Sequence, residues 1–444
     1  MHRCLWLFLL TPVLWGQQTP VLQLSLKRAV EIALAPDGNT RVQLAAQSIQ
    51  IAQARSAQAR AAFLPNLDGT ASYQSFTRNL EAFGLSIPSI RLPGFTFAIP
   101  TFVGPIDVYD VRLNASQSIF DFSSIWRYQA ARESVKATKA DAQGTKDQVA
   151  DQVARAYMTA LRAESVREAA QANLRLSEEL VRLATNQKTA GTGTGIEVTR
   201  GQVQLANDRQ LLEVAQNDVD RARLNVLRLL GLKLDGAIAF TGKMTFAPVD
   251  AVSPEQAWKT ARENRADLKA QQSRESSARL SDNATKWERL PSLGAAADYG
   301  AIGAQTDHMI PTRTIAVSLR VPIFDGGRRE ARRAESFAEF RQEQIRTRDI
   351  AQQAELEIRQ ALDAIRSAQA QVSAAEEGLR LADQELAQAR RRYQAGVTTS
   401  VEVTDAQARL ERARENRVTA LFNYNVARVD LSSATGTIQE FVNR

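Results

Sequence analysis

Cysteine and histidine are almost absent from this sequence. The only cysteine is Cys4, and the only histidines are His2 and His308. A zinc site or a redox site needs several such ligands close together, so no site of this kind can be built. Nothing in the sequence resembles a nucleophile with its base and orienting group either. We therefore predict no catalysis, no cofactor and no bound metal.

The N-terminus lacks an apolar run long enough to span a bilayer. Arg3 precedes an apolar stretch from Leu5 to Trp15, and polar residues follow it. A membrane-spanning helix needs about 20 apolar residues, whereas a secretory signal has a shorter apolar core behind a positive charge. We therefore predict a signal peptide at residues 1–17. Since Cys4 lies inside it, the mature chain would contain no cysteine, which suits an oxidising compartment.

Aromatic residues are scarce, and proline is missing from two long stretches. Aromatics make up 6% of the chain, and much of the 44% apolar fraction is alanine, which suits long, closely packed helices. Residues 123–188 and 327–395 contain no proline. At 1.5 Å per residue each stretch would extend about 100 Å as a helix. We predict two long helical hairpins, at residues 123–231 and 327–436.

Apolar residues in these stretches recur every seven positions. Sustained heptads impose left-handed supercoiling, and alanine at alternate seam positions lets helices approach closely. The pattern predicts coiled-coil packing but does not by itself indicate transport. In the second half the two series are Ile358, Ile365, Val372, Leu379, Leu386 and Tyr393, and Ala361, Ala368, Ala375, Ala382 and Ala389; in the first half the series is Val198, Leu205, Leu212, Val219 and Val226.

Charge of one sign is not concentrated along the chain. The net charge is +7, but the 56 basic residues are interleaved with 49 acidic ones. The tightest basic cluster, Arg390–Arg392, lacks an aromatic platform on which bases could stack. We interpret it as a solvated helix face and predict no nucleic-acid partner.

The sequence contains its main features twice. Ile119-Phe120-Asp121 returns as Ile323-Phe324-Asp325, and the text of residues 189–205 returns at 394–410. Halves this long exceed a solenoid repeat, so we predict a duplicated half-molecule. The first repeat would cover residues 18–232, the second residues 251–444, and residues 233–250 would join them through an equatorial segment with a short strand pair or loop.

Four short segments alternate like strands, near residues 67–76, 108–119, 293–302 and 312–321. A barrel strand with lipid on one side and water on the other needs this pattern, although a half-buried strand of a soluble sheet shows it as well. The apolar positions are Leu67, Ala71 and Tyr73; Tyr109, Val111, Leu113, Ala115 and Ile119; and Ile315, Val317, Leu319 and Val321.

Four strands cannot close a barrel. An open sheet edge is not tolerated in hydrocarbon, because unpaired backbone groups cost several kcal/mol each there. If these strands span a membrane, other copies of the chain must supply the missing ones.

The order of these features resembles that of outer-membrane efflux proteins of the TolC type, over residues 24–437. The similar text is FLPNL at 63–67 and RLPSL at 289–293, VPIFDGGRR at 321–329, and RRYQAGVTTSVEVTDAQARL at 391–410. The resemblance implies a mainly α-helical protein with a small transmembrane β portion. In a trimer, four strands per chain would build a twelve-stranded β-barrel, and the helical hairpins would continue it as a periplasmic α-barrel.

The resemblance also implies functional positions. Strand-to-helix junctions would lie at Phe120 and Asp121 in the first repeat, and at Phe324, Asp325, Gly326 and Gly327 in the second. Gly191 and Gly396 match the hairpin turns that dock on an adaptor. Glu197, Tyr393, Glu402 and Asp405 match the periplasmic gate, although Tyr393 also continues the apolar heptad.

Two positions depart from the family pattern. The first junction has Phe122-Ser123 in place of two glycines, so its turn is expected to be built differently. Thr398 stands where the family's best-known exporter has an arginine, so the ionic part of the gate is not preserved at that position.

The function implied is passive export from the periplasm to the exterior through the outer membrane. Partners would be a periplasmic adaptor (membrane fusion) protein, an inner-membrane transporter of the RND or ABC class, and outer-membrane lipid. One alternative is the outer-membrane component of a type I protein secretion system. Another is a soluble periplasmic coiled-coil adaptor or scaffold, although a scaffold has no need of lipid-facing strands.

Overall fold

The computed structural model describes residues 21–84, 90–92, 94–97, 101–248 and 252–443. The predicted signal peptide lies outside these residues. The chain forms two compact units. The helical unit comprises the described parts of residues 1–47, 141–268 and 350–444, and the sheet unit comprises those of residues 48–140 and 269–349.

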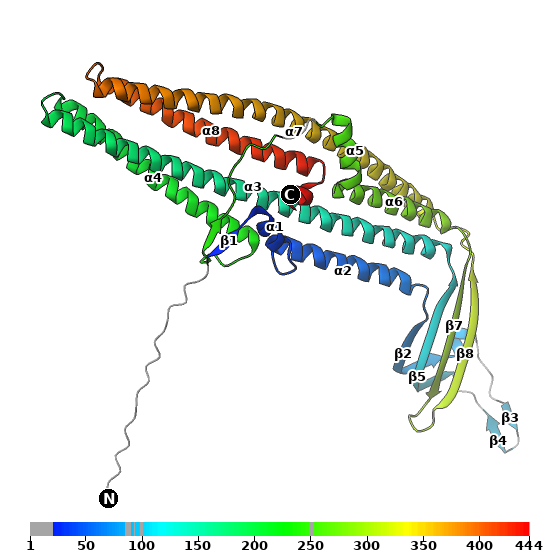
Figure 1. Ribbon diagram of the computed structural model, residues 1–444. Coiled ribbons are helices and arrows are strands. Elements are labelled where there is room, and N and C mark those ends of the chain that lie inside the picture. The colour runs from blue at the N-terminus through cyan, green and yellow to red at the C-terminus, as the bar shows by residue number, and fades with distance from the viewer. Residues whose placement is uncertain (1–20, 85–89, 93, 98–100, 249–251, 444) are drawn as a thin grey trace, which may run out of the picture. The chain divides into compact units, whose positions relative to one another are not determined.

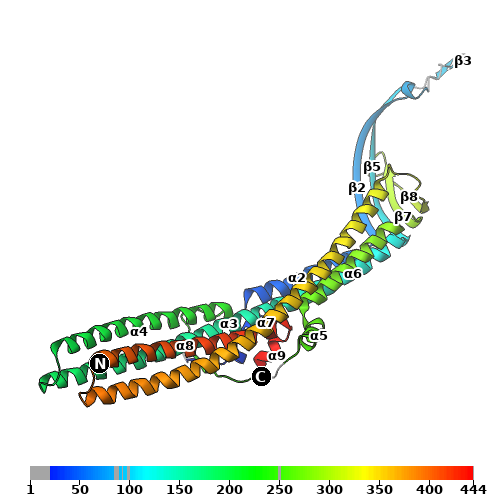
Figure 2. The ribbon, with the colours of Figure 1, turned by 90° about the horizontal axis from the view of Figure 1, so that it is seen from above.

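The helical unit is built from long helices that run side by side in two pairs. Figures 1 and 2 show α4 along α3 and α8 along α7. Four helices extend across the boundary between the units: α2 (Thr40–Ala61), α3 (Phe122–Thr189), α6 (Ala266–Trp287) and α7 (Arg328–Gln394). The others are α1 (Leu26–Leu34), α4 (Gly195–Leu230), α5 (Pro254–Asn264), α8 (Ser400–Ala434) and α9 (Ile438–Asn443).

The heptad of the second half is buried as its period predicts. Ile358 and Val372 are each 1% exposed, and Tyr393 is 5% exposed. The alanine series packs with the apolar series against α8 and the end of α3, in clusters that include Leu176 and Leu410. The predicted coiled-coil packing of α7 is therefore confirmed.

The heptad of α4 is buried only toward its C-terminal end. Val219 and Val226 are each 1% exposed, whereas Val198, Leu205 and Leu212 are partly exposed. Beside them, Ile196, Val203, Leu211 and Val214 are each more than half exposed. Within the described part of one chain, the N-terminal part of α4 therefore lacks a neighbour over much of its apolar surface.

A small core at the middle of the helical unit joins the N-terminal segment to the segment between the repeats. Strand β1 (Leu22–Leu24) pairs in parallel with β6 (Ile238–Phe240). The buried hydroxyl of Tyr157 on α3 donates to the Leu24 carbonyl at 3.0 Å and accepts from the Gly242 amide at 3.0 Å. The joining segment thus contributes one strand, whose partner comes from the N-terminus.

The sheet unit contains one four-stranded antiparallel sheet in the order β2-β5-β7-β8. The strands are β2 (Asn66–Asn79), β5 (Phe102–Phe120), β7 (Ser292–Gly303) and β8 (Ile310–Arg320). Each is close to a segment that the alternation indicated, but β5 begins earlier, and Val321 lies just outside β8. Because β5 pairs with β7, the sheet unites strands from both halves of the sequence, as the side-by-side arrows in Figure 1 show.

The register places most of the large apolar residues of the four strands on one face, although Ile302 and Ile310 pair on the other. Ala71 pairs with Val111 and Val111 with Ala301; toward the other end, Ala297 pairs with Ile315. Polar residues pair on the opposite face, where Arg112 is hydrogen-bonded to Asp110 and Asp298 at 2.8 and 2.9 Å. The large apolar side chains are exposed, with Ile315 at 80%. This sheet therefore has an uncovered apolar face and a polar face.

Ile119 departs from the simple alternation. A register shift lies between Ser118 and Phe120, so that Phe120 and not Ile119 pairs with Leu293. The added residue is a β-bulge, a common feature at barrel rims. Period-two counting cannot register an inserted residue, so the place of Ile119 on the apolar face stays a prediction.

Two further elements were not predicted. A 3₁₀ turn, η1 (Glu81–Phe83), follows β2, and a short hairpin of β3 (Ile90–Leu92) and β4 (Phe95–Phe97) precedes β5. Within the described part of the chain, none of the helices combines the length and the apolar character needed to cross a membrane.

Candidate channel entrance and strand-to-helix junctions

The two strand-to-helix junctions are built differently. In the first, α3 begins at Phe122 directly after the strand, and Asp121 caps it by accepting from the Ser123 amide at 2.9 Å and from the Ser124 hydroxyl. In the second, Gly326 and Gly327 have φ values of 69° and 85°, which favour glycine. Asp325 then accepts from the Arg329 amide and side chain, at 3.2 and 2.9 Å. In both junctions an aspartate accepts a hydrogen bond from an amide in the first turn of the helix. Only the second junction turns through glycines with positive φ.

Aromatic residues border the apolar face of the sheet at both ends. Tyr73 and Tyr109 pair at one end, with ring centroids 4.9 Å apart. At the other end Phe120 contacts Phe122 at 4.3 Å, and Phe122 contacts Trp287 at 5.5 Å. From Tyr109 to Phe120 a tilted barrel strand rises about 25–30 Å, the height of the apolar band in outer-membrane barrels.

Both long hairpins turn on a glycine in the left-handed region. Gly191 and Gly396 have φ values of 75° and 69°, and a β-carbon added at either position would meet open space. In each turn the glycine amide bonds back to the helix, to Lys188 at 3.1 Å and to Tyr393 at 3.0 Å. The next amide reaches one residue further back, to Gln187 and Arg392. This is a Schellman motif, which satisfies the last carbonyls of the helix.

The same motif ends the return helices at Gly231 and Gly436, whose φ values are 72° and 73°. The interval from Gly191 to Gly231 equals that from Gly396 to Gly436. The two hairpins therefore have equal return lengths, which agrees with the predicted duplication.

The structure brings two of the four gate residues together. Glu197 and Tyr393 line one cavity of about 30 Å³ between α3, α4, α7 and α8. Burial raises the pKa of the Tyr393 hydroxyl, and the nearby Glu197 carboxylate raises it further. Among the described residues this hydroxyl has no hydrogen-bond partner. Glu197 itself accepts from the Thr194 amide at 2.9 Å and so closes the capping box of α4.

Glu402 and Asp405 lie outside that cavity. Glu402 accepts a hydrogen bond from Thr398 and lies 3.5 Å from the Arg392 guanidinium. Asp405 is exposed, one turn before Arg409 on α8. Thr398, at the position where the family's best-known exporter has an arginine, therefore donates its hydroxyl to the Glu402 carboxylate, and Arg392 at the end of α7 supplies the positive charge. Sequence comparison by position missed Arg392, because its guanidinium comes from the other helix of the hairpin.

A buried polar network that borders this cavity was also missed. Ser177 on α3 donates to Asp208 on α4, and Gln407 on α8 donates to Ser177 at 2.7 Å. Gln204 donates to Asp208 at 3.0 Å, and Gln407 also donates to Glu411 at 3.1 Å. Asp208 and Gln407 are 1% and 2% exposed. A fully bonded buried network specifies one packing of three helices.

Glu411 makes the stability of this network depend on pH. Burial raises the pKa of its carboxyl, and the charge of Asp208 raises it further, above the ordinary 4.5. A carboxyl whose pKa is raised by folding binds its proton more tightly in the folded state, so folding becomes less favourable as pH rises above 4.5. We expect Glu411→Gln to raise the thermal midpoint at pH 7 and to have little effect near pH 4, as measured by calorimetry. Glu415→Gln, an exposed site on the same helix, is the matched control. An equal gain at both pH values would contradict this electrostatic account.

A sheet with one bare apolar face between aromatic borders, joined to long heptad helices, defines the subunit of an outer-membrane channel. The chain belongs to the outer membrane efflux protein family, whose model matches residues 32–232 and 257–437. It is thus an outer-membrane efflux channel protein, and members of this family transport solutes instead of catalysing reactions.

Known outer-membrane channel proteins are similar to this chain over most of its length. The pyoverdine export outer membrane protein OpmQ of Pseudomonas putida is 26% identical over 426 residues, covering 91% of this chain and 84% of that protein. The outer membrane efflux protein BepC of Brucella suis is 25% identical, covering 73% and 72%. The crystal structure of the Campylobacter jejuni CmeC outer membrane channel superposes with a TM-score of 0.79 at 18% identity, covering 93% and 85%. The fold is therefore that of these channels.

Proposed function

We propose that three copies of this chain form one continuous channel, which exports small molecules with a periplasmic adaptor and an inner-membrane pump. The main support is the sheet. It has four strands, an apolar face and two strands, β2 and β8, at its edges. Because an unpaired edge is costly in hydrocarbon, β2 of one copy is expected to pair with β8 of the next.

The helical unit supports the same assembly. The exposed apolar residues of α4, Ile196, Val203 and Leu211, follow helical spacing on a surface that no described part of the chain covers. A neighbouring copy would bury them in a ring of helices. Family membership excludes the soluble scaffold, and relatives named for export and efflux favour efflux over protein secretion.

The trimer is tested by cross-linking between the edge strands. Single cysteines in β2 and β8 of an otherwise cysteine-free mature chain should form disulfides between copies and yield a covalent trimer in outer-membrane extracts. Cysteines in β5 and β7 should yield no covalent trimer, because each of these inner strands is paired on both edges within its own chain. Efflux itself is tested by complementing a strain that lacks its outer-membrane channel and measuring accumulation of a fluorescent substrate.

We propose that the ends of the hairpins form the regulated entrance. Gly191 and Gly396 would present the turns to an adaptor, while Glu197 and Tyr393 would hold the closed packing. Their common cavity between four helices supports this role. The Tyr393 hydroxyl has no partner among the described residues, and the cost of burying it unpaired would favour opening of the packing.

Asp405 is expected to set the charge selectivity of the entrance. Three exposed copies near the channel axis would attract cations, as carboxylate rings in pores do. Asp405→Asn should lower the cation preference and weaken block by polyvalent cations in planar bilayers. Glu402→Gln should have a smaller effect, since Arg392 and Thr398 already hold that carboxylate. Unchanged selectivity in Asp405→Asn would place the ring elsewhere.

A further inference from the structure

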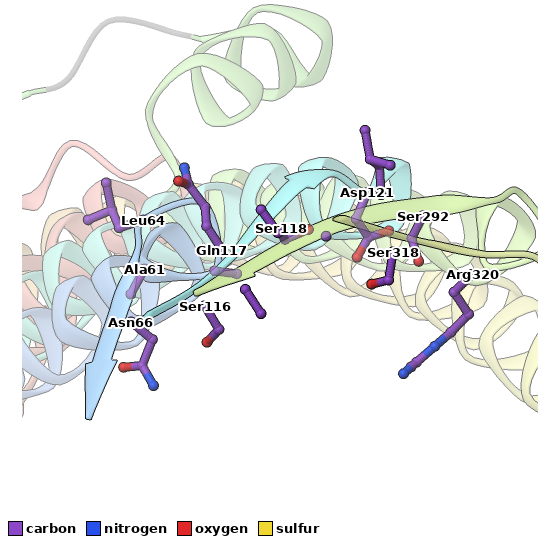
Figure 3. A pocket seen from close by; sticks show the side chains of 15 residues that line it. Ala61, Leu64, Asn66, Ser116, Gln117, Ser118, Asp121, Ser292, Ser318 and Arg320 are labelled. Atoms are coloured by element: carbon purple, nitrogen blue, oxygen red, sulfur yellow. The ribbon is translucent and has the colours of Figure 1, made fainter. Parts of the chain in front are cut away.

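A hollow lies on the polar face of the sheet, where the strands approach the helices. Its volume is about 450 Å³. Figure 3 shows Asn66, Ser116, Ser318 and Arg320 directed to one side of the strands, while Leu64 and Gln117 point to the other. The hollow lies wholly within the sheet unit.

The strand register fixes these side chains on the face that would line the channel. Ser118 pairs with Gly294 and Gly294 with Ser318, and Arg320 pairs with Ser292. These pairs alternate with the apolar pairs, such as Leu293 with Leu319. Arg320 therefore faces away from lipid, although its neighbour on the strand faces toward it.

Arg320 differs from Arg112, the arginine of this face on β5, because no carboxylate of the described residues contacts its guanidinium. In the described part of the chain, its guanidinium has no ion-pair or hydrogen-bond partner. Arg112, by contrast, is bound by Asp110 and Asp298. The Asp121 carboxylate at the rim of the hollow is occupied by Ser123 and Ser124.

The other residues that line the hollow are mostly serines and small residues. The serines at positions 116, 118, 292 and 318 line the same hollow as Arg320, while Gly294 and Ala296 leave space above the backbone. A guanidinium fork binds carboxylate or phosphate oxygens with two parallel hydrogen bonds, and neighbouring hydroxyls donate to the remaining oxygens. An uncompensated cation among small hydroxyl side chains is thus suited to an oxyanion.

We infer that this hollow is a binding site for the carboxylate or phosphate group of an exported anionic solute. The inference rests on the proposed channel and specifies its substrate class. In a trimer, three copies of Arg320 would surround the passage inside the barrel and attract anions there, whereas the entrance at Asp405 attracts cations. The same chemistry would also bind the phosphate of a lipid headgroup, so the experiment separates the two sources.

The test is the binding of citrate to purified full-length protein in a non-ionic detergent, measured by isothermal titration calorimetry. Citrate is expected to bind wild type. Arg320→Gln should weaken binding about tenfold or more, the loss expected for a charge-assisted hydrogen-bonded pair. Arg320→Lys keeps the charge but loses the two parallel donors of the guanidinium, so its affinity for citrate should lie between those of wild type and Arg320→Gln. Arg313→Gln is the matched control, because Arg313 is on the same strand but on the apolar face, and binding should not change.

Planar bilayer recordings provide the second measurement. In a purely zwitterionic lipid, citrate should block wild-type and Arg313→Gln channels, and Arg320→Gln should relieve the block. No citrate binding in calorimetry, or equal weakening by the two glutamine variants, would overturn the inference. A block that occurs only with anionic lipid present would assign Arg320 to a lipid headgroup and overturn it too. Failure of the protein to form any conducting channel would refute the proposed function, while calorimetry would still decide whether the anion site exists.

Discussion

Ile315→Arg is expected to lower the amount of assembled trimer in the outer membrane sharply, because it places a second arginine beside Arg313 on the apolar face of β8. Ile315 lies at the centre of β8, is 80% exposed and pairs with Ala297 on the apolar face. An arginine facing lipid near the bilayer midplane costs about 2–4 kcal/mol, and a trimer would incur this cost three times. The measurement is the amount of heat-sensitive trimer in detergent extracts of outer membranes, on unheated gels.

Thr314→Arg is the control, because it places the same side chain one residue away on the opposite face. Thr314 pairs with Asp298, so an arginine there meets water and a carboxylate. We expect near-normal trimer from this variant. Equal yields from the two variants would show that the two faces of the sheet have been assigned wrongly.

Gly396→Val is expected to leave the trimer intact and abolish efflux in cells. The φ value of 69° at Gly396 is in the left-handed region, which costs an ordinary residue about 1–2 kcal/mol and a β-branched residue more. Since a β-carbon there would meet open space, the cost comes from the backbone alone. The turn should therefore rearrange, while the packed helices below it stay folded. The measurements are drug susceptibility and trimer yield in the same strain.

Two further variants separate turn geometry from side-chain size. Gly396→Asn should retain efflux, because asparagine tolerates the left-handed region. Gly378→Val places the same side chain at an exposed, helical glycine in α7 and should also retain efflux. Normal resistance in Gly396→Val, with normal trimer, would mean that this turn does not dock the adaptor.

Much of the fold follows from periodicity. Heptads predicted the burial of Ile358 and Val372, because helix packing repeats at the same interval as the sequence. Period-two alternation located the four strands and their apolar face, since successive side chains on a strand point to opposite sides. Periodicity does not register insertions, however, so the bulge at Ile119 was not predictable from it.

The candidate entrance was less predictable, because its contacts join residues far apart in the chain. Gly191 and Gly396 were assigned to the hairpin turns from the resemblance to efflux proteins, and the structure gives both a left-handed backbone that favours glycine. The Arg392–Glu402 pair and the Ser177–Asp208–Gln407 network depend on how α3, α4, α7 and α8 pack, and a single sequence does not specify those contacts. Arg320 could be placed on its strand, but its lack of a partner among the described residues is visible only in the folded sheet.

The central claim is that three copies of this chain form one outer-membrane channel. It is tested most directly by determining the location and mass of the native protein in a single experiment, with membrane fractionation followed by light scattering in detergent. The account predicts that the protein is extracted only by detergent from the outer-membrane fraction, with three times the mass of one mature chain. A detergent-independent periplasmic protein with the mass of a single chain would contradict it.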